Sequence, residues 1–233
     1  MSFSNVKSKV VVIDFGSQVT KLIARRVREL NVFSEILTIN QLNKITNYDN
    51  VKGIILSGGP ATVTQKKFPN IPKEIFEKKI PILGICYGLQ LIAKLFGGKV
   101  YQNKKHREFG RSILIQNKNS LLTKNFFKKG KANVWMSHQD SVTKIPKNFI
   151  KIASTKNSVL TVIENKRRNL YGIQFHPEVT HTENGKIILK NFLFSICKIK
   201  KNWKLGDEKE RMITSIKKKL VLIKRFYALY LVA

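Results

Sequence analysis

Short apolar runs alternate with stretches of helical spacing over the first hundred residues. Between the runs, apolar side chains recur every three or four residues, which is the period of an amphipathic helix. The pattern predicts strands over residues 9–16, 33–39, 53–60 and 81–85, and helices over residues 17–30, 71–79 and 89–96. This alternation predicts an α/β fold, a doubly wound and mostly parallel sheet flanked by helices. Its functional groups should gather at the carboxyl ends of the strands.

The pattern changes after Gly98. Short strands joined by polar turns are predicted over residues 99–102, 109–116, 133–136, 150–154, 160–164 and 170–175. This succession indicates a mixed or antiparallel extension of the sheet. A closing helix over residues 184–197 carries its apolar side chains on one face and would complete a domain over residues 1–200.

The strand at residues 81–85 runs into Gly84-Ile-Cys86-Tyr-Gly88. This is a cysteine version of the G-x-S-x-G elbow, in which the nucleophile occupies a strained strand-to-helix turn and the glycines avoid Cβ clashes. The amides and dipole at the start of a helix favour a thiolate, so Cys86 is a candidate nucleophile. The N–H of Tyr87 would point at an oxyanion. The alternative is a buried structural cysteine.

A histidine and a carboxylate follow another apolar strand, in the sequence His176-Pro177-Glu178. Pro177 restrains the backbone and would hold the two side chains in a fixed relation. A thiol nucleophile needs a base that exchanges a proton with a leaving amine, and the base needs an orienting partner. We therefore predict Cys86, His176 and Glu178 as a catalytic set. A lone histidine at a strand end is more often simply hydrogen-bonded.

Charge and cysteine content narrow the function classes. The 233 residues include 44 Lys and Arg against 14 Asp and Glu, a net charge of +30. The cations are mostly lysines spread along the chain beside Asn and Ile, without a nucleic-acid motif. We therefore expect a surface composition that drifted in an AT-rich genome, and no nucleic-acid partner. The sequence shows no zinc spacing, signal peptide or membrane-spanning segment, so we expect a cytoplasmic protein with no metal or membrane partner.

Seven stretches of the chain resemble the class I glutamine amidotransferases, and within them the GMP synthase branch. They are Val11-Val-Ile-Asp-Phe-Gly-Ser-Gln18, Ala24-Arg-Arg-Val-Arg-Glu-Leu30, Ile54-Ile-Leu-Ser-Gly-Gly-Pro60, Gly84-Ile-Cys-Tyr-Gly-Leu-Gln90, Arg107-Glu-Phe-Gly110, Val134-Trp-Met-Ser-His-Gln-Asp140 and Gly172-Ile-Gln-Phe-His-Pro-Glu-Val-Thr-His-Thr182. Asp-Phe-Gly-Ser-Gln, Trp-Met-Ser-His and Thr-His-Thr distinguish that branch from sister amidotransferases. The resemblance implies a flavodoxin-like fold.

The resemblance also implies the chemistry of the site. Cys86 would attack the side-chain amide of glutamine and form a γ-glutamyl thioester, with His176 as general base and then acid and Glu178 as its orienter. The backbone N–H groups of Gly59 and Tyr87 would hold the oxyanion. The positions that match glutamine-binding residues are Gly58, Gln90, Ser137, His138 and Asp140. Glu108 and His181 would contact a synthetase half.

That synthetase half is the partner that the resemblance implies. It is an ATP pyrophosphatase domain or subunit that uses the ammonia to aminate xanthosine monophosphate, and ATP and Mg²⁺ belong to it. No cofactor is expected in the amidotransferase domain itself. This chain alone would supply only ammonia.

The segment 201–233 departs from the family. A linker is recognisable from residue 200 to a helix-like stretch at 208–219, but residues 220–233 are apolar and match nothing expected. One interpretation is a frameshift or sequencing artefact at the start of a synthetase domain, and the other is a natural two-subunit enzyme. As written, the tail should be exposed and prone to aggregation.

Two other functions fit parts of the sequence. A γ-glutamyl hydrolase or cysteine peptidase of related fold would keep the elbow and change the substrate. A basic binding module would use the net charge of +30, with steeply salt-dependent binding to nucleic acid. The Cys86, His176 and Glu178 set favours an enzyme, because a binding module has no need of it.

Overall fold

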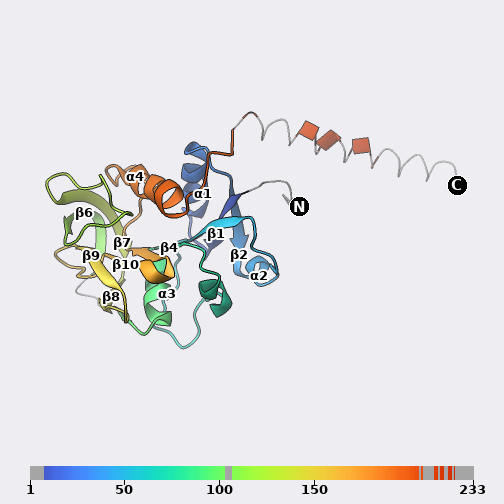
Figure 1. Ribbon diagram of the computed structural model, residues 1–233. Coiled ribbons are helices and arrows are strands. Elements are labelled where there is room, and N and C mark those ends of the chain that lie inside the picture. Colours follow the sequence, from blue (N-terminus) through green and yellow to red (C-terminus); the bar gives the residue numbers. More distant parts are fainter. Residues whose placement is uncertain are drawn as a thin grey trace, which may run out of the picture.

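The computed structural model of the protein describes residues 8–102 and 107–204, together with single residues between positions 206 and 223. Within these residues the centre is a nine-stranded sheet of order β2-β1-β3-β4-β11-β10-β9-β6-β7 (Figure 1). Five strands are parallel, namely β2 (Ser34–Thr38), β1 (Lys9–Asp14), β3 (Val51–Leu56), β4 (Ile82–Ile85) and β11 (Leu170–Ile173). Antiparallel pairing then adds β10 (Val162–Asn165), β9 (Ile150–Ser154), β6 (Glu108–Gln116) and β7 (Lys131–His138). The predicted parallel sheet with an antiparallel extension is confirmed.

Helices cover both faces of the parallel half, as a doubly wound fold requires. One face carries α1 (Thr20–Glu29) and α4 (Gly185–Lys190), which continues as the π-helix Asn191–Ile196; the other carries α2 (Ile39–Leu42) and α3 (Tyr87–Leu95). Strand β1 explains the arrangement. Its Val10 and Val12 pack with the α1 face, whereas Val11 and Ile13 pack with the α3 face. A strand that is buried on both sides needs such a continuous apolar run.

Local details differ from the sequence pattern. The helix expected at residues 71–79 is only the 3-10 helix Lys73–Glu77, and Lys79, two residues after its end, takes a positive φ of 56°. Strand β5 (Lys99–Gln102) lies outside the main sheet and pairs with β8 (Asp140–Lys144), a strand that the pattern did not predict. A strand so short, with polar ends, carries too weak an alternation to be recognised.

The chain after residue 200 leaves the domain at the amino ends of the parallel strands. The side chain of Asn202 accepts a hydrogen bond from the Phe33 N–H at 2.9 Å and donates one to the Ser8 carbonyl at 2.6 Å. Most of the predicted linker and tail at residues 201–233 lies outside the described residues. No described helix has the length and apolar character needed to cross a membrane.

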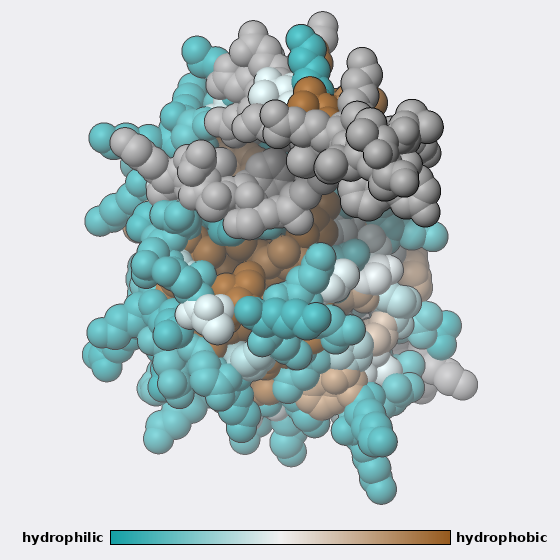
Figure 2. Space-filling view, turned by 90° about the vertical axis from the view of Figure 1, so that its right-hand side faces the viewer, coloured by the Kyte–Doolittle hydropathy of each residue, from teal (hydrophilic) through white to brown (hydrophobic). Residues whose placement is uncertain are grey.

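The high positive charge is spread over the surface. Most described lysines are exposed, and Figure 2 shows hydrophilic side chains around the rim of one face with a smaller apolar area between them. Among the residues that the structure describes, four carboxylates are buried instead: Glu108, Asp140, Glu164 and Glu178. The burial of these acidic groups therefore has to be explained by their local contacts. Three of them, Glu108, Asp140 and Glu178, lie near the predicted site.

Candidate active site

The elbow around Cys86 has the strained geometry that its sequence predicts. Strand β4 ends at Ile85 and helix α3 begins at Tyr87, which leaves Cys86 alone between them with φ 52° and ψ −104°. A non-glycine residue in such a conformation costs about 1–3 kcal/mol, which the surroundings must offset. A Cβ on Gly84 would lie 2.4 Å from the backbone of Gly88, so the close approach of strand and helix requires glycine. The thiol is thereby fixed at the start of α3.

His176 and Glu178 follow β11, the strand beside β4. The Nδ1 atom of His176 lies 2.7 Å from Oε1 of Glu178, and both residues are buried. Burial lowers the pKa of His176, but hydrogen bonds to Cys86 and Glu178 outweigh it and raise the pKa to about 10. A Cβ placed on Gly58 would lie 3.3 Å from Cε1 of His176 and 3.7 Å from Cβ of Cys86, so ring and thiol converge on that turn. The predicted catalytic set comes together.

Two cavities meet at Cys86, and both are also lined by Gly59, Pro60 and Ser137. The first, of about 440 Å³, is called here the Gln90 cavity, because Gln90 lines it together with Thr62, His138, Gln139 and Asp140. The second, of about 430 Å³, is the Trp135 cavity, lined by Trp135 with Gly16, Ser17, Gln18, Val19, His176 and Val179. The glutamine-binding residues predicted from the sequence line the first cavity, except Gly58, which lines neither.

The predicted oxyanion donors lie beside the thiol. Gly59 lines both cavities, and a Cβ on it would come within 2.6 Å of the Phe15 carbonyl oxygen, so only glycine fits. Tyr87 is the first residue of α3, and the N–H of a first residue has no acceptor within its own helix. Gly59 and Tyr87 therefore border the thiol, and the role of their N–H groups as oxyanion donors stays a prediction.

Asp140 gives the Gln90 cavity its negative charge. Its Oδ2 accepts a hydrogen bond from Thr62, whereas the buried Oδ1 has no partner among the described residues. An unpaired buried carboxylate oxygen is costly unless a cation or donor reaches it. The position suits the α-amino group of an amino acid. Ser137 contributes its main chain, since its carbonyl oxygen lies 3.7 Å from the Cys86 sulfur.

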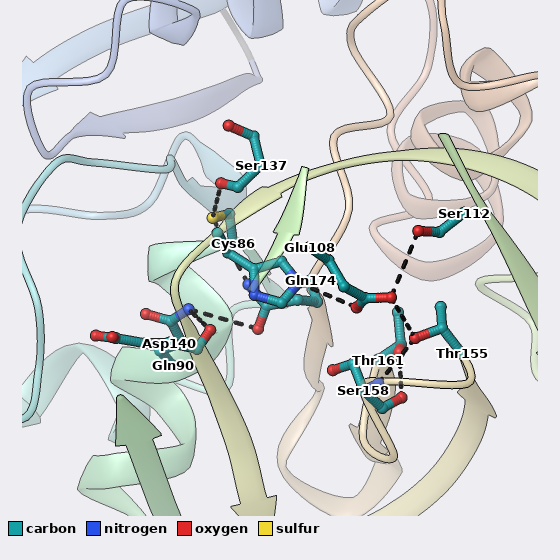
Figure 3. Close-up of polar contacts among 11 residues, drawn as sticks. Cys86, Gln90, Glu108, Ser112, Ser137, Asp140, Thr155, Ser158, Thr161 and Gln174 are labelled. Atoms are coloured by element: carbon teal, nitrogen blue, oxygen red, sulfur yellow. Dashed lines mark hydrogen bonds and ion pairs between the residues drawn. The ribbon is translucent and has the colours of Figure 1, made fainter. Parts of the chain in front are cut away.

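Glu108 does not reach the surface, which corrects the expectation that it contacts a partner. It is only 4% exposed, and its Oε2 lies 3.3 Å from Nε2 of the equally buried His138, its register partner across β6 and β7. Its other oxygen accepts hydrogen bonds from Thr155 and Ser112 (Figure 3). A partner protein cannot touch a carboxylate that is enclosed in this way. His181, in contrast, is exposed, and the centroid of its ring lies 4.4 Å from that of the Trp135 ring, with the two planes tilted by 33°.

Gln174 is a site residue that the sequence reasoning missed. It is fully buried, and its Nε2 lies 3.6 Å from the Cys86 sulfur (Figure 3). The backbone fixes the orientation of this amide. The Asp140 carbonyl can only accept, so the Gln90 group 2.8 Å from it must be NH₂. That NH₂ lies 3.5 Å from Gln174, whose oxygen must face it.

A hydrogen-bond donor is therefore left pointing at the sulfur of Cys86. Because an N–H group stabilises a thiolate more than a thiol, Gln174 favours the reactive form of the nucleophile. The position of Gln174 two residues before His176 was visible in the sequence, but the orientation of its amide depends on Gln90 and β8.

The second cysteine has a different environment. Cys197 is buried behind Gly53 at the end of the closing helix, and burial raises the pKa of its thiol. This is the core position that the sequence pattern predicts. No group of His, Cys, Asp and Glu side chains in the described part of the chain could hold a metal ion.

Comparisons with known proteins identify the family of this chain. The model of the glutamine amidotransferase class-I family matches residues 11–196. GMP synthase [glutamine-hydrolyzing] of Brachyspira hyodysenteriae is 49% identical over 210 residues, which are 90% of this chain and 40% of that protein. The protein of that name from Borrelia garinii is 49% identical over 218 residues, 93% of this chain and 40% of that protein. The chain thus spans about two fifths of the length of these curated relatives.

Solved structures show the same relationship. A Thermoplasma acidophilum protein named as a GMP synthase subunit is 33% identical with a TM-score of 0.70, over 82% of this chain and 94% of that one. A Thermotoga maritima glutamine amidotransferase is 20% identical with a TM-score of 0.67, over 83% of this chain and 99% of that one, and supports the fold alone. With the family model matched over most of its length, the chain belongs to the class-I glutamine amidotransferases.

Proposed function

We propose that this chain hydrolyses the side-chain amide of glutamine and supplies the ammonia for amination of xanthosine monophosphate to GMP. The observation that carries the proposal is the convergence of Cys86, the His176–Glu178 pair and the Asp140 cavity at one strand-to-helix turn. The GMP step rests on the relatives, which are named as whole GMP synthases and are longer than this chain.

The first half of the reaction makes the thioester. The Cys86 thiolate attacks the amide carbon, and the N–H groups of Gly59 and Tyr87 bind the negative charge on the oxygen. One such donor is typically worth about 3 kcal/mol of barrier. The C–N bond then breaks while the His176 imidazolium gives its proton to the leaving nitrogen, so ammonia departs as a neutral molecule.

The second half needs His176 as a base. Once Cys86 is acylated its negative charge is gone, and one of the interactions that raise the pKa of His176 goes with it. The ring can then take a proton from water as the water attacks the thioester. Glu178 keeps Nδ1 protonated throughout, so that Nε2 is the nitrogen that exchanges protons.

Asp140 and Gln90 would hold the substrate. The unpaired Oδ1 of Asp140 suits the α-ammonium group, with His138, Ser137 and Gly59 completing the cavity. The acceptor of the ammonia would be an ATP pyrophosphatase domain or subunit, with His181 at the surface it approaches. ATP and Mg²⁺ would bind to that partner.

Labelling with a diazoketone analogue of glutamine tests the proposal. Cys86 should gain one adduct, measured as the intact mass of the protein, and Cys86→Ala should gain none. Cys197→Ala is the matched control, because it removes the other thiol and should label like the wild type. Labelling on Cys197, or on the wild type and Cys86→Ala alike, would refute the nucleophile. Faster cleavage of a γ-glutamyl peptide than of free glutamine would reassign the substrate.

A further inference from the structure

The two cavities that meet at Cys86 differ in charge and in catalytic groups. The Gln90 cavity contains the carboxylate of Asp140, which suits the ammonium end of an amino acid. The Trp135 cavity is lined by no Asp, Glu, Lys or Arg among the described residues, and it contains His176, which the Gln90 cavity lacks. The cavities are therefore suited to different molecules.

The chemistry of amide cleavage connects the leaving nitrogen to His176. That nitrogen must receive a proton as the C–N bond breaks, and Nε2 of His176 is the group that supplies it under the proposed function. Because His176 lines only the Trp135 cavity, the nitrogen leaves Cys86 on that side. A wall without carboxylates also suits the passage of a neutral molecule, since no anion would trap it as ammonium.

We propose that the Trp135 cavity is the exit compartment for ammonia and the entry compartment for the water or amine that attacks the thioester. This inference deepens the proposed function and rests on it. The walls of the compartment are held in place. The backbone N–H of Trp135 donates to Thr182 Oγ1 at 3.0 Å, the Trp135 ring lies against the ring of His181, and Val179 lies directly after the catalytic Glu178.

The test uses microscopic reversibility, since an amine reaches the thioester along the path by which ammonia leaves. Glutamine is supplied with methylamine at alkaline pH, and the ratio of γ-glutamylmethylamide to glutamate is measured. The methylamine nitrogen attacks the thioester carbon, the C–S bond breaks, and His176 takes the proton. The ratio does not depend on how fast the chain turns over.

Val179→Trp fills the compartment, and Thr180→Trp is the matched control because Thr180 lines neither cavity. Gln18→Trp is measured in parallel as a second variant of the same wall, in case Val179→Trp does not fold. Gln18 is exposed, so its position tolerates a bulky side chain. We expect the product ratio to fall about tenfold in both wall variants while the KM for glutamine stays nearly constant. Thr180→Trp should match the wild type.

Two results would overturn the inference. A raised KM with an unchanged product ratio would mean that the Trp135 cavity holds glutamine, and an unchanged ratio and KM would mean that the amine takes another path. Both differ from failure of the proposed function, in which the wild type neither forms glutamate nor labels at Cys86.

Discussion

The His176–Glu178 and His138–Glu108 pairs contain the same two residue types and are equally buried, yet they differ in geometry. His176 and Glu178 are two residues apart at a strand end and make a 2.7 Å hydrogen bond. His138 and Glu108 come from adjacent strands and are 3.3 Å apart, and neither ring nitrogen of His138 makes a hydrogen bond within the described residues.

The difference shows what makes an acid–imidazole pair catalytic. The first pair lies at the carboxyl edge of the parallel strands, where the elbow brings in a thiol. The second lies in the antiparallel extension, where Thr155 and Ser112 tie Glu108 to the neighbouring residues of the fold. Position relative to Cys86, and not residue type, assigns the first pair to proton transfer and the second to support of the cavity wall.

Removal of each imidazole should give the largest contrast. His176→Ala removes the proton donor and acceptor of both half-reactions, and we expect kcat to fall about 10²–10⁴-fold. His138→Ala leaves proton transfer intact and should act mainly on KM, because His138 lines the Gln90 cavity. Initial rates of glutamate formation check both variants. A comparable loss of kcat in His138→Ala would remove the distinction between the two pairs.

Neutralising each carboxylate should separate activity from stability. Glu178→Gln leaves His176 without the anion that orients it, so kcat should fall about 10²-fold or more. Glu108→Gln should leave kcat almost unchanged and lower the free energy of unfolding by about 1–3 kcal/mol, because a buried charge-assisted contact is lost. Steady-state kinetics should show the loss of kcat in Glu178→Gln, and urea unfolding should show the loss of stability in Glu108→Gln. Similar losses for both variants in both assays would contradict this separation.

The pH dependence of stability adds a second readout for Glu178→Gln. Burial lowers the pKa of His176, but contacts with Cys86 and Glu178 raise it to about 10, above its ordinary value near 6.5. The protonated ring therefore favours the folded state; this contribution is complete below about pH 6.5 and is lost as the pH rises through about 10. In Glu178→Gln the loss should move to lower pH, because the carboxylate no longer raises the pKa. An unchanged curve would mean that Glu178 does not hold the proton on His176.

The two pairs also mark what the sequence can predict. Cys86, His176 and Glu178 lie in local motifs, and a strand-to-helix turn or a proline fixes their geometry within a few residues. Glu108 and His138 meet only through the register of β6 and β7, which one sequence does not specify. Strand β8 was missed for a related reason, since it is held by pairing with β5 rather than by its own apolar pattern.

Gln174 gives the smallest expected effect and the finest test of how the thiol is prepared. Its amide connects Cys86 to Gln90, and through Gln90 to the carbonyl of Asp140. Gln174→Met keeps the length of the side chain and removes the donor. It should lower the rate at which iodoacetamide alkylates Cys86 at neutral pH by about tenfold or less.

The ionisable groups near this thiol are His176 with Glu178 behind it and, around the Gln90 cavity, Asp140 and His138. Gln174→Met changes none of them, so slower alkylation would come from the lost N–H donor itself. Gln174→Glu sharpens the test, because it has the same shape but offers an acceptor or a negative charge to the sulfur, and should slow alkylation further. If Gln174 only fills space, Gln174→Glu should alkylate at the rate of the wild type, and the support of the thiolate would then come from His176 and the start of α3 alone.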